Sequence, residues 1–287
     1  MTDKLTPEER LASLYAKCRP VRTPCGDGTM AWQLWGQPTD KTPLILVHGG
    51  FGSWTHWVAN VERLSKDRLV VTLDIPGLGD SDEIAPPINS MALAQPIIAG
   101  LDTVIGEGTR FDVAAFSFGS VISSQVLKQV GERCRTMVFT GGSGFQGMHH
   151  LVTGTIIPGP DETEESIKEI HKKNLGILML WNEDKIDDFA VYTHALNIAR
   201  ARVRSRKMSL SNTTAEALPD IKARLAGIWG LHDATGGGRE RILARRDLMR
   251  QYQDEVPFHI IEEAGHWVMY EAPEAYEAAL LQILDGA

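Results

Sequence analysis

A series of short apolar runs constrains the fold of this sequence more than any other feature. Each run has the length of a β-strand, and most lack the polar alternation of a sheet with one solvated face. Stretches with helical spacing separate the runs, and this alternation predicts a mostly parallel sheet that is flanked by helices. The runs extend from Leu44 to His48, Leu69 to Asp74, Asp112 to Phe116, Thr136 to Thr140, Leu225 to Gly230 and Pro257 to Ile261.

Two further regions complete the predicted organisation. The segment from Met30 to Gly36 follows a Gly-Asp-Gly turn and predicts antiparallel strands at the edge of the sheet. Between about Gly141 and Ala217 no run resembles a core strand, and a structureless loop of that length is uncommon in a compact domain. We therefore expect an α/β core formed by residues 1–140 and 218–287, with residues 141–217 inserted as a helical lid.

Composition and charge argue against several classes of protein. The 287 residues are 43% hydrophobic, which suffices for one large core. A formal net charge of -8 argues against a nucleic-acid partner, because such proteins usually present a basic face. No apolar run approaches the roughly 20 residues that cross a bilayer, and the first residues do not resemble a signal peptide. Thr6, Pro7 and Glu9 instead predict the start of a helix.

The cysteines bear on the cellular compartment and on metal binding. The sequence has 3 of them, which are scattered along the chain at Cys18, Cys25 and Cys134. This is too few for a disulfide framework and the wrong spacing for a metal site. We expect a cytoplasmic protein that has no membrane partner.

Ser117 follows the apolar run that ends at Phe116, and a stretch with helical spacing comes after it. These neighbours predict a strand-to-helix turn, which needs small residues two positions to either side of the serine, here Ala115 and Gly119. On such a turn the hydroxyl projects from the carboxyl edge of the sheet, and the Phe118 amide faces a developing oxyanion. The alternative is that Ser117 only caps the following helix.

A histidine and an aspartate follow the last predicted strands. A serine hydroxyl needs a base, and His266 lies in a loop from which it could reach Ser117. Asp233 follows the strand that ends at Gly230, where it could orient His266 and stabilise its charged form. The alternatives are a surface or core histidine and an Asx turn before the glycines that follow Asp233. The chain order of serine, aspartate and histidine favours a catalytic triad.

The glycine-rich loop after the first parallel strand reads HGGFGSWTHW. Glycines let backbone amides approach a ligand, so we expect Gly50 to be the second oxyanion donor, with Phe51 as the neighbouring alternative. His48 is expected to support the loop by hydrogen bonding. Glycines that merely turn the chain are the other interpretation. The phosphate-binding pattern G-x-x-x-x-G-K is absent from the sequence.

Together, the segments LVHGGFGSWTHW, LDIPGLGDSD, AFSFGS, WGLHDA and AGHWVMYEAPE resemble the α/β-hydrolase superfamily over nearly the whole chain outside the lid. The resemblance implies the α/β-hydrolase fold and a triad of Ser117, Asp233 and His266. The superfamily includes esterases, lactonases, peptidases, dehalogenases, haloperoxidases and C–C hydrolases, so the fold alone does not define the reaction. A serine at position 117, where haloalkane dehalogenases have aspartate, disfavours dehalogenation.

Within the superfamily, HGG, DIPGLGDSD and GHW look most like the branch that contains the meta-cleavage-product hydrolases, which cut a C–C bond in vinylogous diketone acids. In that group a lid arginine binds the substrate carboxylate. The basic block from Ala199 to Lys207, which we expect to be helical, offers four candidates, and we favour Arg204. The alternative is a solvated helix face that pairs with the acidic stretch before it. The candidates are Arg200, Arg202, Arg204 and Arg206.

Aromatic residues bracket the predicted site and suggest a mainly apolar pocket. Phe51, Phe118 and Trp267 adjoin the oxyanion loop, the nucleophile and the base. We expect a serine hydrolase that acts on a small carbonyl substrate with an apolar or aromatic portion, without cofactor or metal. A C–C hydrolase is favoured, with a carboxylesterase or lactonase as the alternative. A perhydrolase or transferase and a noncatalytic ligand-binding relative stay open, as does the oligomeric state, a homo-oligomer included.

Overall fold

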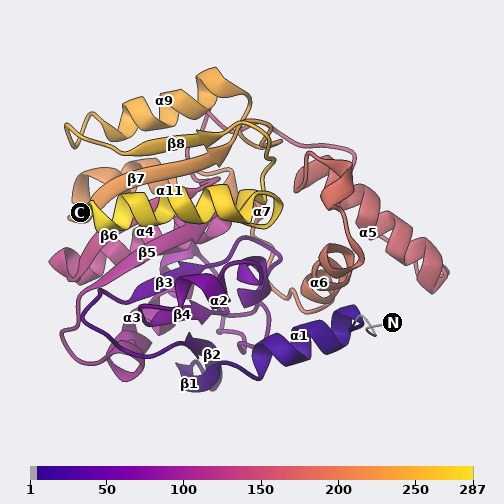
Figure 1. The fold of residues 1–287 in the computed structure, drawn as a ribbon, viewed down its shortest axis with the longest axis horizontal. Coiled ribbons are helices and arrows are strands. Elements are labelled where there is room, and N and C mark those ends of the chain that lie inside the picture. Colours follow the sequence, from indigo (N-terminus) through magenta and orange to yellow (C-terminus); the bar gives the residue numbers. More distant parts are fainter. Residues whose placement is uncertain (1–4, 287) are drawn as a thin grey trace.

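The computed structural model describes residues 5–286 and contains one eight-stranded sheet with the order β1-β2-β4-β3-β5-β6-β7-β8 (Figure 1). Strands β3 to β8 run parallel, while β2 runs antiparallel to both β1 and β4. This confirms every predicted core strand, the antiparallel edge and the predicted α/β-hydrolase fold. The strands are β1 (Arg19–Cys25), β2 (Gly28–Trp35), β3 (Leu44–Val47), β4 (Val70–Leu73), β5 (Phe111–Phe116), β6 (Cys134–Thr140), β7 (Arg224–Gly230) and β8 (Phe258–Ile261).

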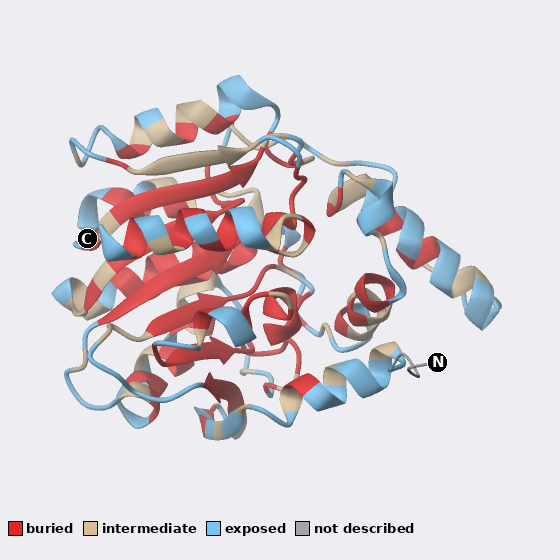
Figure 2. Ribbon diagram, in the orientation of Figure 1, coloured by how far each residue is buried: buried red, intermediate tan, exposed pale blue. Residues whose placement is uncertain are grey.

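The central strands are buried (Figure 2). Their alternate side chains enter two separate hydrophobic cores, so both faces of the sheet are covered. In β5, Val113 and Ala115 contribute to one core, and Ala114 and Phe116 contribute to the other. This explains the continuous apolar runs of the sequence. Helices α3 (Ser90–Ile105), α4 (Phe118–Val130) and α9 (Arg239–Met249) cover one face, and α2 (Val61–Leu64) and α11 (Pro273–Asp285) cover the other.

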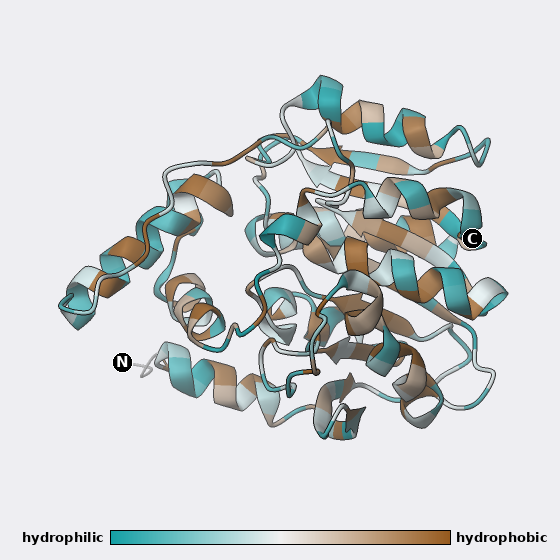
Figure 3. Cartoon of the chain, turned by 180° about the vertical axis from the view of Figure 1, so that it is seen from behind, coloured by the Kyte–Doolittle hydropathy of each residue, from teal (hydrophilic) through white to brown (hydrophobic). Residues whose placement is uncertain are grey.

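The segment 141–217, which we call the lid, is described throughout and contains helices without a strand. In Figure 1 its two longest helices stand beyond the carboxyl ends of the parallel strands. Seen from behind, α6 is largely hydrophobic, whereas α5 carries both hydrophilic and hydrophobic parts (Figure 3). The lid helices are α5 (Glu164–Leu178), α6 (Asp188–Ala199), α7 (Arg206–Ser209) and α8 (Thr213–Ala217), with a 3-10 turn η3 (Glu183–Lys185).

Helix α1 (Pro7–Tyr15) begins at the predicted cap. The Thr6 hydroxyl accepts a hydrogen bond from the Glu9 amide at 3.2 Å, and the Glu9 carboxylate accepts one from the Thr6 amide at 2.8 Å. Such a reciprocal pair satisfies two backbone donors at the helix start. The helix packs on the lid, where the Arg10 guanidinium lies 4.0 Å from the centre of the Phe189 ring in α6 (Figure 1).

The basic block from Ala199 to Lys207 is not the continuous helix that we expected. Helix α6 ends at Ala199, and residues 200–205 form an irregular segment before the short α7. The Arg202 amide donates to the Gly77 carbonyl at 2.9 Å, and Val203 packs against the same glycine. The Arg202 guanidinium donates to the Ser81 carbonyl. These contacts with the loop after β4 outweigh the helical propensity of the arginines.

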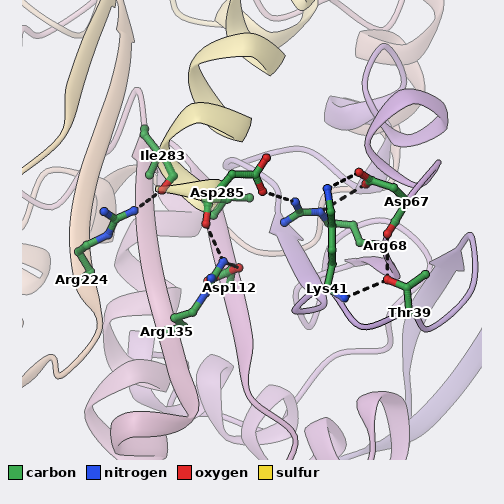
Figure 4. A network of polar contacts seen from close by, with 10 residues as sticks. Thr39, Lys41, Asp67, Arg68, Asp112, Arg135, Arg224, Ile283 and Asp285 are labelled. Atoms are coloured by element: carbon green, nitrogen blue, oxygen red, sulfur yellow. Dashed lines mark hydrogen bonds and ion pairs between the residues drawn. The ribbon is translucent and has the colours of Figure 1, made fainter. Parts of the chain in front are cut away.

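A network of ion pairs lies at the amino end of the parallel strands (Figure 4). Arg135 forms two hydrogen bonds with the Asp112 carboxylate, at 2.9 and 2.6 Å, and a third with the Leu284 carbonyl. Arg68 lies 3.0 Å from Asp285. Because Asp112 is near the start of β5, this network fastens the end of α11 to the edge of the sheet opposite Ser117.

The remaining short elements are 3-10 turns at η1 (Trp54–Trp57), η2 (Gly131–Arg133) and η4 (Leu218–Asp220), and the single helical turn α10 (Val268–Glu271) after β8. Among residues 5–286, no helix combines the length and the apolar character that crossing a bilayer requires.

Candidate active site

Ser117 lies on a tight turn between β5 and α4, with φ 49° and ψ -118°. A positive φ is rare for any residue other than glycine, and such strain is concentrated at functional sites. Two residues later, a Cβ at Gly119 would lie 2.6 Å from the His48 carbonyl oxygen, so this approach requires glycine. Within the described residues 117–130, the Ser117 side chain makes no capping hydrogen bond to α4. The geometry therefore differs from the simple helix cap that was the alternative.

The structure brings Ser117, Asp233 and His266 together. His266 Nε2 lies 3.0 Å from Ser117 Oγ, and His266 Nδ1 lies 2.9 Å from Asp233 Oδ1. The three residues follow β5, β7 and β8, and the carboxyl ends of parallel strands meet at one edge of a sheet. An ionised Asp233 only accepts, so Nδ1 carries the proton of a neutral His266, and Nε2 is free to accept from the serine hydroxyl.

The carboxylate of Asp233 forms an Asx turn in addition to its contact with His266. Its Oδ1 accepts hydrogen bonds from the Thr235 amide at 2.7 Å, the Thr235 hydroxyl at 2.8 Å and the Gly236 amide at 3.1 Å. Asp233 therefore forms the Asx turn and contacts His266 at the same time. Burial favours a higher pKa for this carboxyl, but His266 and the Thr235 hydrogen bonds outweigh it and lower the pKa below its usual value.

The glycine-rich loop lies against the turn that carries Ser117. A Cβ at Gly49 would lie 3.2 Å from Ser117 Cβ, and a Cβ at Gly50 would lie 3.5 Å from Phe118 Cβ. Phe118 is the first residue of α4, so its amide is among those that find no acceptor within the helix. The structure thus places both candidate oxyanion donors, Gly50 and Phe118, beside the serine.

Two buried histidines hold this loop. His48 Nδ1 lies 2.7 Å from the Gly49 carbonyl oxygen, and His48 Nε2 accepts from the Ile75 amide at 2.9 Å, which confirms its predicted supporting role. His56 Nδ1 accepts from the Gly49 amide at 3.1 Å. Burial lowers the pKa of His48 to about 4 and that of His56 well below its usual value. Both imidazoles are therefore neutral near pH 7, and they support the loop without adding charge to it.

A family model for alpha/beta hydrolases matches residues 44–279, which span the sheet from β3 onward and the lid and include Ser117, Asp233 and His266. The chain belongs to the alpha/beta hydrolase family.

Particular relatives of this alpha/beta hydrolase include enzymes with different reactions. It is 26% identical over 267 residues to a 2-hydroxy-6-oxononadienedioate/2-hydroxy-6-oxononatrienedioate hydrolase of Escherichia coli O81 (strain ED1a), covering 86% of this chain and 88% of the relative. The structure of a meta-cleavage product hydrolase superposes with a TM-score of 0.72 at 18% identity, covering 93% of this chain and 98% of the other. The structure of the carboxylesterase CesB from Bacillus subtilis superposes with a TM-score of 0.71 at 18% sequence identity, covering 98% of this chain and 96% of the other. At these identities the superpositions establish the fold alone.

The residues expected to contact substrate lie in different surroundings in this alpha/beta hydrolase. Phe51 follows Gly50 with a positive φ of 51°, and its side chain is 38% exposed. Trp267 is buried, and its indole nitrogen donates to the His56 carbonyl at 2.8 Å. Phe118 is buried as well, and its side chain contributes to the hydrophobic core. The structure thus leaves Phe51 accessible in the glycine-rich loop, whereas the side chains of Phe118 and Trp267 pack inward.

Arg204 is exposed between two buried residues, Val203 and Ser205, in the irregular segment after α6. Ser205 packs so tightly on the oxyanion loop that a Cβ at Gly50 would collide with its hydroxyl. Ser205, the neighbour of Arg204, therefore contacts the glycine-rich loop, whereas Arg204 itself is exposed.

Sequence reasoning missed several histidines around the site of this hydrolase. His171 of α5 and His194 of α6 pack edge to face across the lid, with ring centres 5.3 Å apart. His149, at the start of the lid, is near enough to His266 for their charges to interact. Burial lowers the pKa of both His194 and His149 to about 4, so these polar groups are neutral. Nothing local in the sequence indicates that α5 and α6 pair.

Proposed function

We propose that this protein is a serine hydrolase that cleaves esters of small carboxylic acids through Ser117, His266 and Asp233. The observation that carries this proposal is the chain of contacts from Ser117 Oγ to His266 Nε2 and from His266 Nδ1 to Asp233 Oδ1, at 3.0 and 2.9 Å. A serine paired with an imidazole, which is in turn oriented by a carboxylate, is the arrangement that activates a hydroxyl as a nucleophile.

The proposed reaction has two stages. In the first, His266 Nε2 takes the proton of Ser117 Oγ as this oxygen attacks the ester carbonyl carbon. The oxyanion receives hydrogen bonds from the Gly50 and Phe118 amides, and the alcohol leaves with the proton from His266. In the second stage, His266 deprotonates a water that attacks the acyl carbonyl carbon, and the bond from this carbon to Ser117 Oγ breaks. His266 then returns the proton to Ser117 Oγ, and the carboxylic acid leaves. Asp233 stabilises the imidazolium in both stages, which its lowered pKa supports.

The neutral character of the surroundings favours an ester over a substrate that carries a carboxylate. Two of the four lid arginines considered as carboxylate ligands have other partners: Arg200 pairs with Asp80 at 2.9 Å, and Arg202 binds backbone carbonyls of the core. Arg204 and Arg206 are exposed, and the Arg206 guanidinium donates to the Val152 carbonyl at 3.4 Å. The buried histidines nearby are neutral near pH 7. A substrate with an apolar or aromatic portion suits the accessible Phe51 beside the oxyanion loop.

A C–C bond hydrolase of the meta-cleavage type is the second candidate. The 26% identity to a hydrolase of that kind over 86% of this chain supports it. In this case a ring-fission acid is ketonised first, and the same serine and histidine then promote cleavage at the carbonyl. The residue pair Ser117–Phe118 stands where that group has a serine followed by methionine, which does not favour this reaction.

The deciding experiment compares the wild type with Ser117→Ala on a short-chain aryl ester and on a ring-fission dienoate acid. Removal of the nucleophile should lower ester turnover by about six orders of magnitude. Faster Ser117-dependent loss of the dienoate than of the ester would instead support the C–C reaction. Full turnover of both substrates by Ser117→Ala would overturn the proposal and leave a protein that binds ligands without this chemistry.

A further inference from the structure

Glu271 and Arg245 are buried charged residues that the proposed chemistry does not use. Their exposed fractions are 3% and 1%. Burying a charge is costly unless hydrogen bonds replace its hydration, so the partners of a buried charge indicate what it holds in place. The Glu271 carboxylate and the Arg245 guanidinium both bind backbone groups. Each side chain joins the lid to a loop that carries a residue of the proposed triad.

Glu271 joins the lid to the loop that carries His266. Its Oε2 accepts from the Gly265 amide at 2.6 Å and from the Trp181 amide at 3.3 Å, and its Oε1 accepts from the Asn182 amide at 2.6 Å. Gly265 directly precedes His266, whereas Trp181 and Asn182 lie in the lid between α5 and η3. One carboxylate therefore holds a lid segment and the histidine loop against each other.

A second contact joins the same two segments on the other side of His266. The Trp267 amide donates to the Met179 carbonyl of the lid at 2.7 Å. A Cβ at Gly265 would lie 2.8 Å from the Trp181 nitrogen, so the lid chain passes directly over the histidine loop. His266 is thus flanked in sequence by two residues whose amides are fixed by Glu271 and by the lid.

Arg245 makes the corresponding connection for the loop that carries Asp233. Its guanidinium donates to the Gly236 carbonyl at 2.9 Å and to the Met148 carbonyl at 2.8 Å. Gly236 belongs to the Asx turn of Asp233, and Met148 lies near the start of the lid. Two residues after Met148, the His150 amide donates to the Thr235 carbonyl at 2.9 Å. Arg245 therefore fastens the entry of the lid to the aspartate loop.

We propose that Glu271 and Arg245 are positioning residues that align His266 with Asp233 by seating the lid on their two loops. The inference rests on the proposed function, because it concerns the efficiency of the same triad. The bond between His266 and Asp233 joins two loops, and each of these loops has a second anchor in the lid. Loss of either anchor frees one partner of that bond, and misplacement of a catalytic group by about 1 Å can cost about 100-fold in rate.

The chain offers a matched control for each residue. Glu277 is 2% exposed in α11, where its hydrogen-bond and ion-pair partners are Asn60 and Arg63. Arg68 is 1% exposed and belongs to the network at the opposite end of the sheet (Figure 4). Neutralising these residues should destabilise the fold to a similar extent and leave the triad aligned.

The test compares Glu271→Gln and Arg245→Met with Glu277→Gln and Arg68→Met in the full chain. Measured quantities are Tm, kcat and KM on an aryl acetate, and the rate of labelling by a fluorophosphonate. We expect kcat and the labelling rate to fall about 10- to 100-fold in the first two variants, with KM changed less than about 3-fold. The two controls should lower Tm similarly and keep kcat within about 2-fold of the wild type. Equal kcat losses in all four variants, or wild-type kcat in the first two, would overturn the inference.

A second pair of variants tests one hydrogen bond of Glu271 without changing a buried charge. It keeps the inference testable if Glu271→Gln or Arg245→Met fails to fold. Asn182→Pro deletes the amide that Glu271 Oε1 accepts from, at a φ of -87° that proline nearly matches, whereas Asn182→Ala keeps that amide. We expect a lower kcat in the proline variant alone, and equal kcat in both would contradict the coupling. If Ser117→Ala loses activity but Glu271→Gln keeps the kcat of the wild type, this inference is refuted while the proposed function stands.

Discussion

The two ends of the sheet both gather buried polar side chains, but they use them differently. At the amino end, Arg135 and Asp112 neutralise each other (Figure 4). At the carboxyl end, Ser117 is held at a strained positive φ, and the nearby histidines are neutral. Charge pairing at one end holds strands and the last helix together, whereas the other end combines backbone strain at the proposed nucleophile with uncharged imidazoles. Stability and proposed activity are thus separable along the same strand, β5.

The largest effect that separates the two ends is expected from Ser117→Ala. Turnover of an aryl ester should fall by about six orders of magnitude, because the proposed nucleophile is lost. The Tm should stay close to that of the wild type, since the Ser117 side chain does not cap α4. Steady-state kinetics and thermal unfolding of the same preparation check both expectations. An equal loss of stability would mean that this end also serves the fold.

Asp112→Ala should produce the opposite pattern at the amino end. Asp112 is fully buried, and its loss leaves Arg135 with only the Leu284 carbonyl, so we expect a cost of about 2 kcal/mol in the free energy of unfolding. The value lies below that of a fully buried pair because the Arg135 side chain is 25% exposed. Urea unfolding measures it, while kcat should stay unchanged. A fall in kcat of the folded protein would show that the two ends are coupled through β5.

The neutral histidines predict how stability depends on pH at the carboxyl end and in the lid. Burial lowers the pKa of His48 and His194 from 6.5 to about 4. Their contribution to stability is therefore complete above pH 6.5 and is lost as the pH falls toward 4, because the unfolded chain binds protons that the folded one does not. Each such histidine should lower the free energy of unfolding by about 1.4 kcal/mol per pH unit within this window.

A variant in the lid sharpens this expectation. His194→Gln should remove the contribution of one histidine to the slope of the free energy of unfolding against pH. Asp112→Ala, at the other end of the sheet, should leave this slope unaltered between pH 6.5 and 5. Urea unfolding at several pH values distinguishes the two. An unchanged slope in His194→Gln would mean that this imidazole is already protonated in the folded protein.

The smallest effect is expected from Arg204→Ala. Because Arg204 is exposed on the irregular segment after α6, ester turnover should stay within about 2-fold and stability within about 0.5 kcal/mol. The same variant assayed on a ring-fission dienoate examines the second candidate function. A rise in KM of more than about 10-fold for that acid alone would mean that the lid repositions Arg204 onto a carboxylate.

The accuracy of sequence reasoning differs between the core and the lid for a physical reason. The strands and the turn at Ser117 were predictable because their signals are local: apolar runs of strand length and small residues at fixed offsets from the serine. The basic block was wrongly expected to be helical because Gly77 and Ser81, which hold it in an irregular conformation, are more than a hundred positions away. A single sequence carries no signal of such pairings.

Glu271 illustrates the same limit within the candidate site. The residue is visible in the sequence five positions after His266, but its partners in the lid are Trp181 and Asn182. Only the folded chain shows that this carboxylate binds backbone amides of two segments. The approach of Ser117, Asp233 and His266 to one another was predictable because each lies within a few residues of the end of a recognisable strand. The residues proposed to align the triad were not, since their roles depend on how the lid is placed.

The most direct test of the central claim is fluorophosphonate labelling of the wild type, followed by mass measurement of the intact protein and of its peptides. The proposed triad predicts rapid formation of one adduct per chain, located on Ser117, and its loss in both Ser117→Ala and His266→Gln. Slow labelling that His266→Gln does not affect, or an adduct on a different serine, would contradict the assignment of Ser117 as the nucleophile.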